Sequence, residues 1–300
     1  MKPAGETIDL SVVRSQSRLA DFWTLSKPEL SLLSLLTTLA GYFCASQHGI
    51  VFGHLALTLL GTGLLAAGAA ALNMYVEREY DGQMRRTQKR PLPSGRMKPG
   101  EALLFGILTG VTGAFLLATT INLLTAALGV VTYASYVFVY TPLKRKSTWN
   151  TLVGCIPGAI PPIMGWSAVR NDLSLDAWAL FAILFMWQMP HFLSLAWMYR
   201  ADYKRGGFKM LPTEEAEDGM RTSIHILVFC ALLIPASLLP VVFGMSGMIY
   251  TVVALLLGVS FFALSIVLVI RRTNELARRV FFASLIYIPA LFIILMIDKA

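Results

Sequence analysis

Long apolar segments recur along almost the whole chain, and shorter polar segments separate them. An α-helix needs about 20 apolar residues to cross the hydrocarbon core of a bilayer. Segments near that length cover residues 30–46, 51–72, 102–120, 123–140, 152–169, 178–197, 224–243, 248–270 and 280–297. The pattern predicts an all-α membrane protein with nine transmembrane helices.

The first 29 residues are polar and lack the apolar core and cleavage site of a signal peptide. We therefore expect a cytoplasmic N-terminal segment at residues 1–29, followed by one polytopic domain at residues 30–300. Residues 17–23 are expected to form an interfacial helix ahead of the first span. Cys44, Cys155 and Cys230 each lie alone in an apolar span, so we interpret them as small core residues.

Positive charge is concentrated in alternate connections between the spans. With the N-terminus on the cytoplasmic side, all of the 25 Lys and Arg residues except Arg170 and Lys299 fall on that side. An excess of Lys and Arg marks the cytoplasmic face of a membrane protein. The net charge of +8 therefore reports orientation, with the N-terminus in the cytoplasm and the C-terminus outside, and does not indicate a nucleic-acid partner. We expect the membrane to be the bacterial cytoplasmic (inner) membrane.

The long cytoplasmic connections follow the second and the sixth predicted spans. Each therefore holds the same place in a group of four spans, which predicts two four-helix halves with a ninth helix added. Repeats of this kind commonly place the functional site at the interface between the halves. Prolines interrupt the fifth, sixth and seventh spans, and either packing kinks or a cavity lining would explain them. They are Pro157, Pro161, Pro162, Pro190 and Pro235.

Three side chains with oxygen donors recur every four residues where the second span ends. On a helix, Asn73, Glu77 and Asp81 would each be rotated by only about 40° from the last and would together span roughly 12 Å. Charged residues at the rim of a membrane helix are costly and usually functional. Mg²⁺ prefers such oxygen ligands and is usually shared with substrate phosphates. The spacing therefore predicts a magnesium site.

Two further polar segments lie at the same predicted membrane face. Lys144, Arg145 and Lys146 follow the fourth span, where they anchor the helix and can also bind a diphosphate. His191 follows Pro190 within the sixth span, and Asp202 lies at its cytoplasmic end. A single His in a span is usually a packing residue and such an Asp is usually solvated, so both a structural and a functional role stay open.

These residues carry a resemblance to a known family. Asn73-x-x-x-Glu77-x-x-x-Asp81 and Met84-Arg85-Arg86-Thr87-x-x-Arg90-Pro91 resemble the first motif of the intramembrane aromatic prenyltransferases of the UbiA superfamily. Three other segments resemble the branch of that superfamily that farnesylates haem. They are Tyr140-Thr141-Pro142-Leu143-Lys144-Arg145, Pro161-Pro162-x-x-Gly165-Trp166, and Pro190-His191-Phe192 followed by Asp202-Tyr203. The resemblance covers residues 20–297 and implies nine helices around a central cavity that opens toward the cytoplasm.

The chain departs from the pattern of the superfamily at two places. Glu77 stands where Asp is usual, and its longer side chain should still ligate Mg²⁺ with shifted geometry. Many members also carry a second pair of aspartates four residues apart, whereas here Met198 precedes Asp202 at that spacing. A second full metal site beside Asp202 is therefore not implied.

Joined to the spacing, the resemblance implies transfer of a farnesyl group from farnesyl diphosphate to the vinyl group of haem b (protohaem IX), which gives haem O. Asn73, Glu77 and Asp81 would hold the Mg²⁺ cofactor, with His191 and Asp202 as further catalytic candidates. The expected diphosphate-binding residues are Arg85, Arg86, Arg90, Lys144, Arg145 and Lys204. The implied partners are the two substrates, membrane lipid, and a downstream haem A synthase or terminal oxidase under assembly.

Several roles and two other functions remain open. His191 could contact haem or handle a proton near the vinyl group, or be structural. Asp202 could join a second Mg²⁺ or orient Lys204 and Arg205, while Arg200 and Lys209 could pair with haem propionates. A prenyltransferase with a quinone precursor or a chlorophyll-type acceptor is one alternative. A secondary transporter is the other, although transporter sites lie near the bilayer midplane and these acids lie at its edge.

Overall fold

The computed structural model describes residues 17–47 and 49–299. Within those ranges, nine helical spans are long and apolar enough to cross a membrane. The first four are α2 (Pro28–Ala45), α3 (Phe52–Asp81), α4 (Pro99–Thr120), and a composite of α5 (Leu123–Ala134), the π-helix η2 (Ser135–Tyr140) and α6 (Thr141–Leu143). The others are α7 (Asn150–Ala159) with α8 (Pro161–Arg170), α9 (Leu175–Met198), α12 (Met220–Val242), α13 (Met248–Arg271) and α14 (Asn274–Ile297). All nine predicted spans are confirmed, and the chain is an integral membrane protein.

The prolines act differently from one span to the next. Pro161 and Pro162 divide the fifth span, because α7 ends at Ala159 and α8 begins at Pro161. A proline has no N–H to donate to the preceding turn, so a helix can restart at it but not pass through it unchanged. Pro190 and Pro235, in contrast, lie inside the continuous helices α9 and α12.

The segment ahead of the first span is helical, as predicted. The hydroxyl of Ser17 accepts a hydrogen bond of 3.3 Å from the amide of Ala20 and caps α1 (Arg18–Leu25). Leu19 and Trp23, one turn apart on the outer face, are 81% and 68% exposed, whereas Leu25 is fully buried. An amphipathic helix with exposed Leu and Trp is suited to the interface between lipid and water.

Glycines allow α2 and α8 to cross in backbone contact. A Cβ on Gly165 would lie 1.9 Å from the carbonyl oxygen of Thr38, and a Cβ on Gly41 would lie 2.0 Å from that of Pro162. The hydroxyl of Thr38 also donates to the carbonyl of Pro161 at 3.1 Å. Small residues at such crossings are a common means of helix association in membranes. The contact fixes the first span against the fifth.

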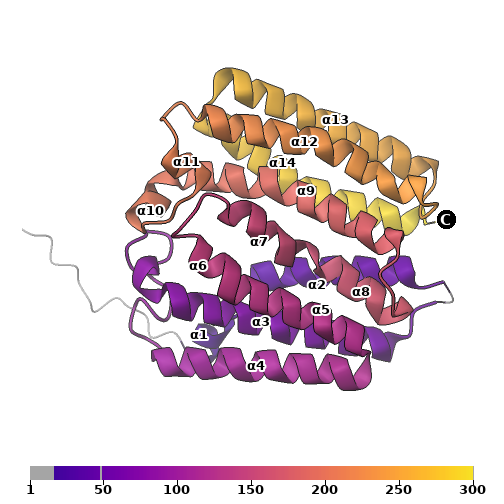
Figure 1. Cartoon of the computed structure of the whole chain (residues 1–300), viewed down its shortest axis with the longest axis horizontal. Helices are drawn as coiled ribbons and strands as arrows, with labels where there is room; N and C mark the ends of the chain where they lie inside the picture. Colours follow the sequence, from indigo (N-terminus) through magenta and orange to yellow (C-terminus); the bar gives the residue numbers. More distant parts are fainter. Residues whose placement is uncertain (1–16, 48, 300) are drawn as a thin grey trace, which may run out of the picture.

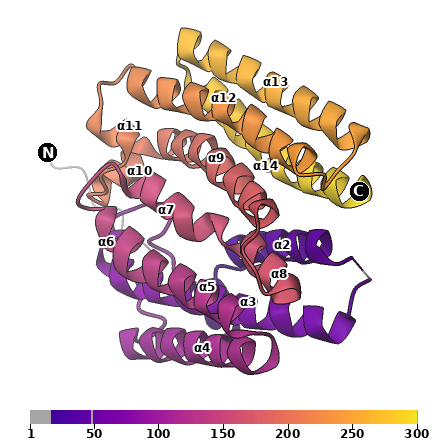
Figure 2. The ribbon, with the colours of Figure 1, turned by 45° about the vertical axis from the view of Figure 1, so that its right-hand side comes forward.

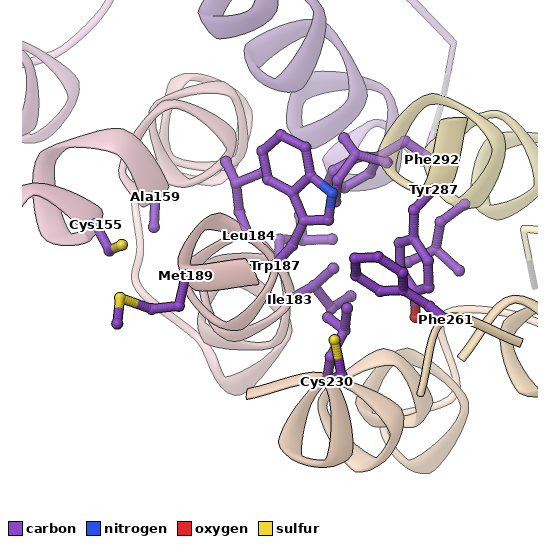
Figure 3. Close-up of a cluster of buried hydrophobic side chains, with 14 of the residues drawn as sticks. Cys155, Ala159, Ile183, Leu184, Trp187, Met189, Cys230, Phe261, Tyr287 and Phe292 are labelled. Carbon is purple, nitrogen blue, oxygen red and sulfur yellow. The ribbon is translucent and has the colours of Figure 1, made fainter. Parts of the chain in front are cut away.

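The main hydrophobic core lies around α9. Figure 3 shows Trp187, Phe261 and Tyr287 packed together, and all three side chains are buried. The indole N–H of Trp187 donates to the carbonyl of Ser284 at 2.7 Å, so this large side chain is buried with its polar atom satisfied. Cys155 and Cys230 lie in the same core, which confirms their interpretation as buried packing residues.

Polar connections gather at one end of the helical bundle. Figure 1 shows the end of α3, α6, α10 (Arg200–Arg205) and α11 (Leu211–Glu214) at the left, and the C-terminal end of α14 at the right. In Figure 2, α12, α13 and α14 form a group beside α9, apart from α3, α4 and α5. The order of neighbours repeats, since α3 packs on α4 and α4 on α5, as α9 packs on α12 and α12 on α13. This agrees with the predicted two halves and added ninth helix.

Candidate active site

The second span continues beyond its apolar part as one uninterrupted helix. Helix α3 has 30 residues and ends at Asp81, so Asn73, Glu77 and Asp81 lie on the same helix. Their side chains are 0%, 5% and 1% exposed. A spacing of four residues brings them to one face, as predicted. This face is turned into the protein, which makes it a site enclosed by other segments.

Three cations from three different segments meet these side chains. The ammonium of Lys27 donates to Oδ1 of Asn73. Nζ of Lys144 lies 2.8 Å from Oε1 of Glu77, and a guanidinium nitrogen of Arg90 lies 2.7 Å from Oδ2 of Asp81. Lys144 and Arg90 were predicted to bind diphosphate, and the structure places both at the predicted metal ligands.

Lys27 contacts a predicted metal ligand, although it is not among the site residues predicted from the sequence. It lies between α1 and α2 with a positive φ of 44° and is followed by Pro28, the first residue of α2. A non-glycine residue rarely adopts this left-handed conformation, which here points the chain into α2. Burial, and then the charges of Arg90 and Lys144, lower the pKa of Lys27 to about 7. The sequence did carry one signal for this role: Lys27 stands directly before Pro28, the proline that opens the first span.

Lys144 is held at the site by its neighbours. Burial lowers its pKa, but Glu77 and then Tyr140 outweigh this effect, so the pKa is raised above its usual value and Lys144 stays charged. The ammonium lies 4.6 Å from the ring centroid of Tyr140, the last residue of the π-helix. Single π-helical turns occur frequently at functional sites. The backbone of Lys144 also accepts a hydrogen bond of 2.7 Å from the amide of Lys209.

The donor set of α3 fits a hard divalent cation. Oδ1 of Asp81 is buried without a hydrogen-bond partner among the described residues, and a metal ion is one ligand that would satisfy it. Within those same residues, no three His, Cys, Asp or Glu side chains come together as metal ligands. Two carboxylates and an amide nevertheless suit Mg²⁺, which keeps several waters and shares substrate phosphates. The assignment of these residues as metal ligands remains a prediction.

Asp202, in the long connection after α9, contacts the long connection after α3. Oδ2 of Asp202 accepts a hydrogen bond of 3.3 Å from the amide of Arg86, and Oδ1 pairs with Arg205. The guanidinium of Arg86 in turn donates to the hydroxyl of Tyr203 at 3.1 Å. One role left open for Asp202 was to orient Lys204 and Arg205. Among the described residues it pairs with Arg205 and not with Lys204.

A cavity of about 420 Å³ opens beside Glu77. Arg145 and Tyr80 line it, and the guanidinium of Arg145 lies 3.8 Å from the ring centroid of Tyr80. Phe208 closes another side, its ring centroid 6.3 Å from that of Tyr80. Cations and aromatic rings therefore surround an opening that reaches a predicted metal ligand. Arg85 is exposed and makes no contact in this lining.

His191 lies apart from this cluster. Its ring stacks between Trp187 and Phe281, with centroids 4.8 Å and 4.9 Å away. Nδ1 of His191 lies 2.8 Å from the hydroxyl oxygen of Ser284 on α14. These contacts join α9 to α14 and favour the structural role. Arg200 was considered for haem propionates, but its guanidinium donates to the backbone carbonyls of Glu215 and Glu217.

Comparison with known proteins agrees with this geometry. The model of the UbiA prenyltransferase family matches residues 34–286. The chain belongs to the UbiA prenyltransferase family. It is 44% identical over 288 residues to a protoheme IX farnesyltransferase of Solibacter usitatus, covering 93% of this chain and 98% of that one. It is 48% identical over 278 residues to a protoheme IX farnesyltransferase of Salinibacter ruber, with the same two coverages.

Solved structures share the UbiA fold at low sequence identity. A digeranylgeranylglyceryl phosphate synthase superimposes with a TM-score of 0.79 at 17% identity, covering 93% of this chain and 98% of that chain. A UbiA homologue from Archaeoglobus fulgidus bound to GPP and Mg²⁺ gives a TM-score of 0.68 at 17% identity, covering 92% and 99%. The predicted fold class, a UbiA-like all-α membrane protein, is confirmed.

Proposed function

We propose that this UbiA-family chain transfers a farnesyl group from farnesyl diphosphate to the vinyl group of haem b, giving haem O. The observation that carries the proposal is the buried trio of Asn73, Glu77 and Asp81 at the end of α3, each with a cation against it. The names of the relatives from Solibacter usitatus and Salinibacter ruber support haem as the acceptor.

The cations of the site would hold the diphosphate and stabilise it as it leaves. Lys144 and Arg90 already lie at the carboxylates, and Arg145 lines the cavity beside Glu77. Positive groups that face developing negative charge are usually the largest electrostatic contribution to catalysis. Arg offers a bidentate contact to phosphate and Lys a single point charge, so the set can grip several oxygens at once.

Asn73, Glu77 and Asp81 would hold Mg²⁺. Oδ1 of Asp81, which has no hydrogen-bond partner within residues 17–47 and 49–299, is the atom that supports this assignment. When bound, the metal would neutralise charge on the diphosphate oxygens and so ease departure of the leaving group. The structure of the UbiA homologue bound to GPP and Mg²⁺ supports use of a divalent metal in the family. The protein's own contribution is to fix these three oxygen donors on one rigid helix.

The steps after departure of the diphosphate would take place in the apolar interior of the protein. Loss of diphosphate leaves an allylic cation, which the vinyl group of haem attacks to form a carbon–carbon bond. Water then adds to the resulting cation and loses a proton, which leaves a hydroxyethylfarnesyl side chain. The protein must keep water from the first cation, and closure of a site by apolar side chains is a recognised way to prevent such side reactions.

The orientation in the membrane follows from charge. We place the site end of the bundle, with the N-terminus, in the cytoplasm and the C-terminus outside, in the inner membrane of a bacterium. The Lys and Arg distribution supports this orientation, since Arg170 and Lys299 alone fall on the other side. Farnesyl diphosphate would then reach the site from the cytoplasm. A haem A synthase or a terminal oxidase under assembly would receive the product.

A comparison of acceptors tests the proposal. Purified protein is supplied with radiolabelled farnesyl diphosphate, Mg²⁺ and either haem b or 4-hydroxybenzoate. Label that enters the haem alone supports the proposal, and label that enters 4-hydroxybenzoate alone assigns the chain to a branch with quinone precursors. The secondary transporter is the other alternative, and flux of labelled substrate into vesicles without any new covalent product would favour it.

A further inference from the structure

Each of the three predicted metal ligands, Asn73, Glu77 and Asp81, is matched by its own cation. The three cations come from distant parts of the sequence, namely Lys27 before α2, Arg90 after α3 and Lys144 after α6. Lys144 and Arg90 are themselves mostly buried, with side chains 14% and 23% exposed. The fold therefore brings positive charge to the oxygen atoms expected to bind a positive metal ion.

The local charge follows from these pairs. Glu77 and Asp81 contribute two negative charges, and Lys144 and Arg90 cancel them. Lys27 cannot make the cluster negative in either protonation state. Unit charges a few ångströms apart interact strongly in a partly buried site, because the effective dielectric constant there is much lower than that of water. A free divalent cation would thus meet carboxylates that are already neutralised, and it would be repelled by the charges of Lys144 and Arg90 beside them.

A magnesium–diphosphate complex should be attracted to the same cations that repel free Mg²⁺. A prenyl diphosphate carries more negative charge than one Mg²⁺ neutralises, so the complex is an anion. Lys144 and Arg90 can then turn from the carboxylates to the phosphate oxygens, and this exchange frees Glu77 and Asp81 for the metal. Every charge keeps a partner throughout, as buried ionic groups require.

We infer that Mg²⁺ enters this site only together with the diphosphate, because Lys144 and Arg90 guard the carboxylates of Glu77 and Asp81 against free metal. The inference rests on the proposed function, since it concerns how the donor substrate of that reaction binds. It makes Lys144 and Arg90 the residues that set the order of binding, in addition to their contact with phosphate.

The inference predicts that removing either cation lowers the stability of the protein but raises its affinity for Mg²⁺. Replacing Arg90 or Lys144 by Met leaves a buried carboxylate without its cation, which destabilises the fold. The same change should raise the affinity for Mg²⁺ alone, because the metal can now neutralise the orphaned acid. Ligands that bind the folded state raise its stability. Mg²⁺ alone should therefore raise the melting temperature of Arg90→Met and Lys144→Met, while leaving that of the unaltered protein almost unchanged.

Equilibrium dialysis of the full chain in detergent tests the inference, with retained Mg²⁺ measured by elemental analysis. The unaltered protein should retain Mg²⁺ at least about tenfold more tightly with inorganic pyrophosphate than without it. Arg90→Met and Lys144→Met should bind Mg²⁺ alone at least about tenfold more tightly than the unaltered protein. Lys89→Met, which alters an exposed cation of the same connection, is the matched control and should behave as the unaltered protein does.

Two outcomes would overturn the inference and can be told apart. If the unaltered protein retains Mg²⁺ equally well without pyrophosphate, the guarding role is wrong and the proposed function stands. If neither the unaltered protein nor Lys89→Met retains Mg²⁺ with pyrophosphate, the site is not a magnesium–diphosphate site, and the proposed mechanism fails as well. The melting measurement keeps the variants informative where low stability prevents dialysis.

Discussion

The amide of Arg86 donates a hydrogen bond of 3.3 Å to Oδ2 of Asp202, and this bond joins the two long polar connections of the chain. The other oxygen of Asp202 pairs with Arg205. Both oxygens of this acid are thus engaged by the protein, in contrast to Asp81, whose Oδ1 has no hydrogen-bond partner among the residues described. The two acids therefore differ in what they can offer to a metal.

This difference predicts unequal effects of two matched substitutions. Asp81→Asn removes the negative charge of a proposed metal ligand and should lower kcat by at least about 100-fold. Asp202→Asn weakens a residue that positions Arg86, and it should lower kcat by about tenfold, as for partners that orient a site. Steady-state formation of farnesylated haem by each variant measures the two effects. An Asp202→Asn variant as inactive as Asp81→Asn would instead make Asp202 a direct ligand.

The departure at Glu77 can be tested by restoring the usual residue of the superfamily. Glu77→Asp keeps the carboxylate and should stay within about tenfold of the original activity, whereas Glu77→Gln should lose most of it because the negative charge is removed. The shorter side chain retreats from Lys144, which now lies 2.8 Å from Oε1, but the long lysine side chain can follow it. The measurement is kcat/KM for both variants at saturating Mg²⁺. An inactive Glu77→Asp would show that this site requires the longer side chain.

A structural role of His191 can be distinguished from a catalytic one by altering its hydrogen-bond partner, Ser284. Ser284→Ala removes the hydroxyl that contacts Nδ1 of His191 and should cost about 0.5–1.5 kcal/mol of stability, the usual net contribution of one such bond. Turnover of haem below the melting temperature should stay near that of the unaltered protein, because this contact only joins α9 to α14. Thermal unfolding in detergent and kcat are measured on the same sample. A large fall in kcat with unchanged melting would give His191 a part in the chemistry.

The crossing of α2 and α8 predicts a position where even one methyl group is harmful. Gly165→Ala would place Cβ 1.9 Å from the carbonyl oxygen of Thr38, and such overpacking typically costs about 1–3 kcal/mol. Gly53→Ala is the control, since a Cβ there meets nothing within 4 Å. Melting temperatures should fall for the first variant and not for the second. Equal melting of both would mean that the two helices can separate freely at this point.

Much of the fold was predictable because a bilayer imposes a simple pattern on sequence. Backbone polar groups must be satisfied within each span, so an apolar segment of sufficient length becomes a helix. Helix α3 and its row of oxygen donors were predictable for a similar reason, since a period of four residues is a property of one helix. Contacts within a single element can be deduced from spacing alone.

The sequence predicted that cations would lie at the site, but it did not predict which acid each cation contacts. Arg90 and Lys144 stand in motifs near the membrane edge, yet nothing in the sequence shows that one reaches Asp81 and the other Glu77. Lys27 was counted only as a topological charge, because its approach to Asn73 depends on how α1 and α2 pack. Such contacts depend on tertiary structure, and spacing carries no information about them.

The mass of haem extracted after incubation with farnesyl diphosphate is the measurement on which the proposed reaction depends. With Mg²⁺ present, haem b should become heavier by one farnesyl group and one hydroxyl group, and excess chelator should abolish that product. Asp81→Asn should give unmodified haem under both conditions. Unmodified haem from folded protein supplied with both substrates and Mg²⁺ would contradict a metal-assisted transfer at the end of α3, and so would the same yield of product in excess chelator.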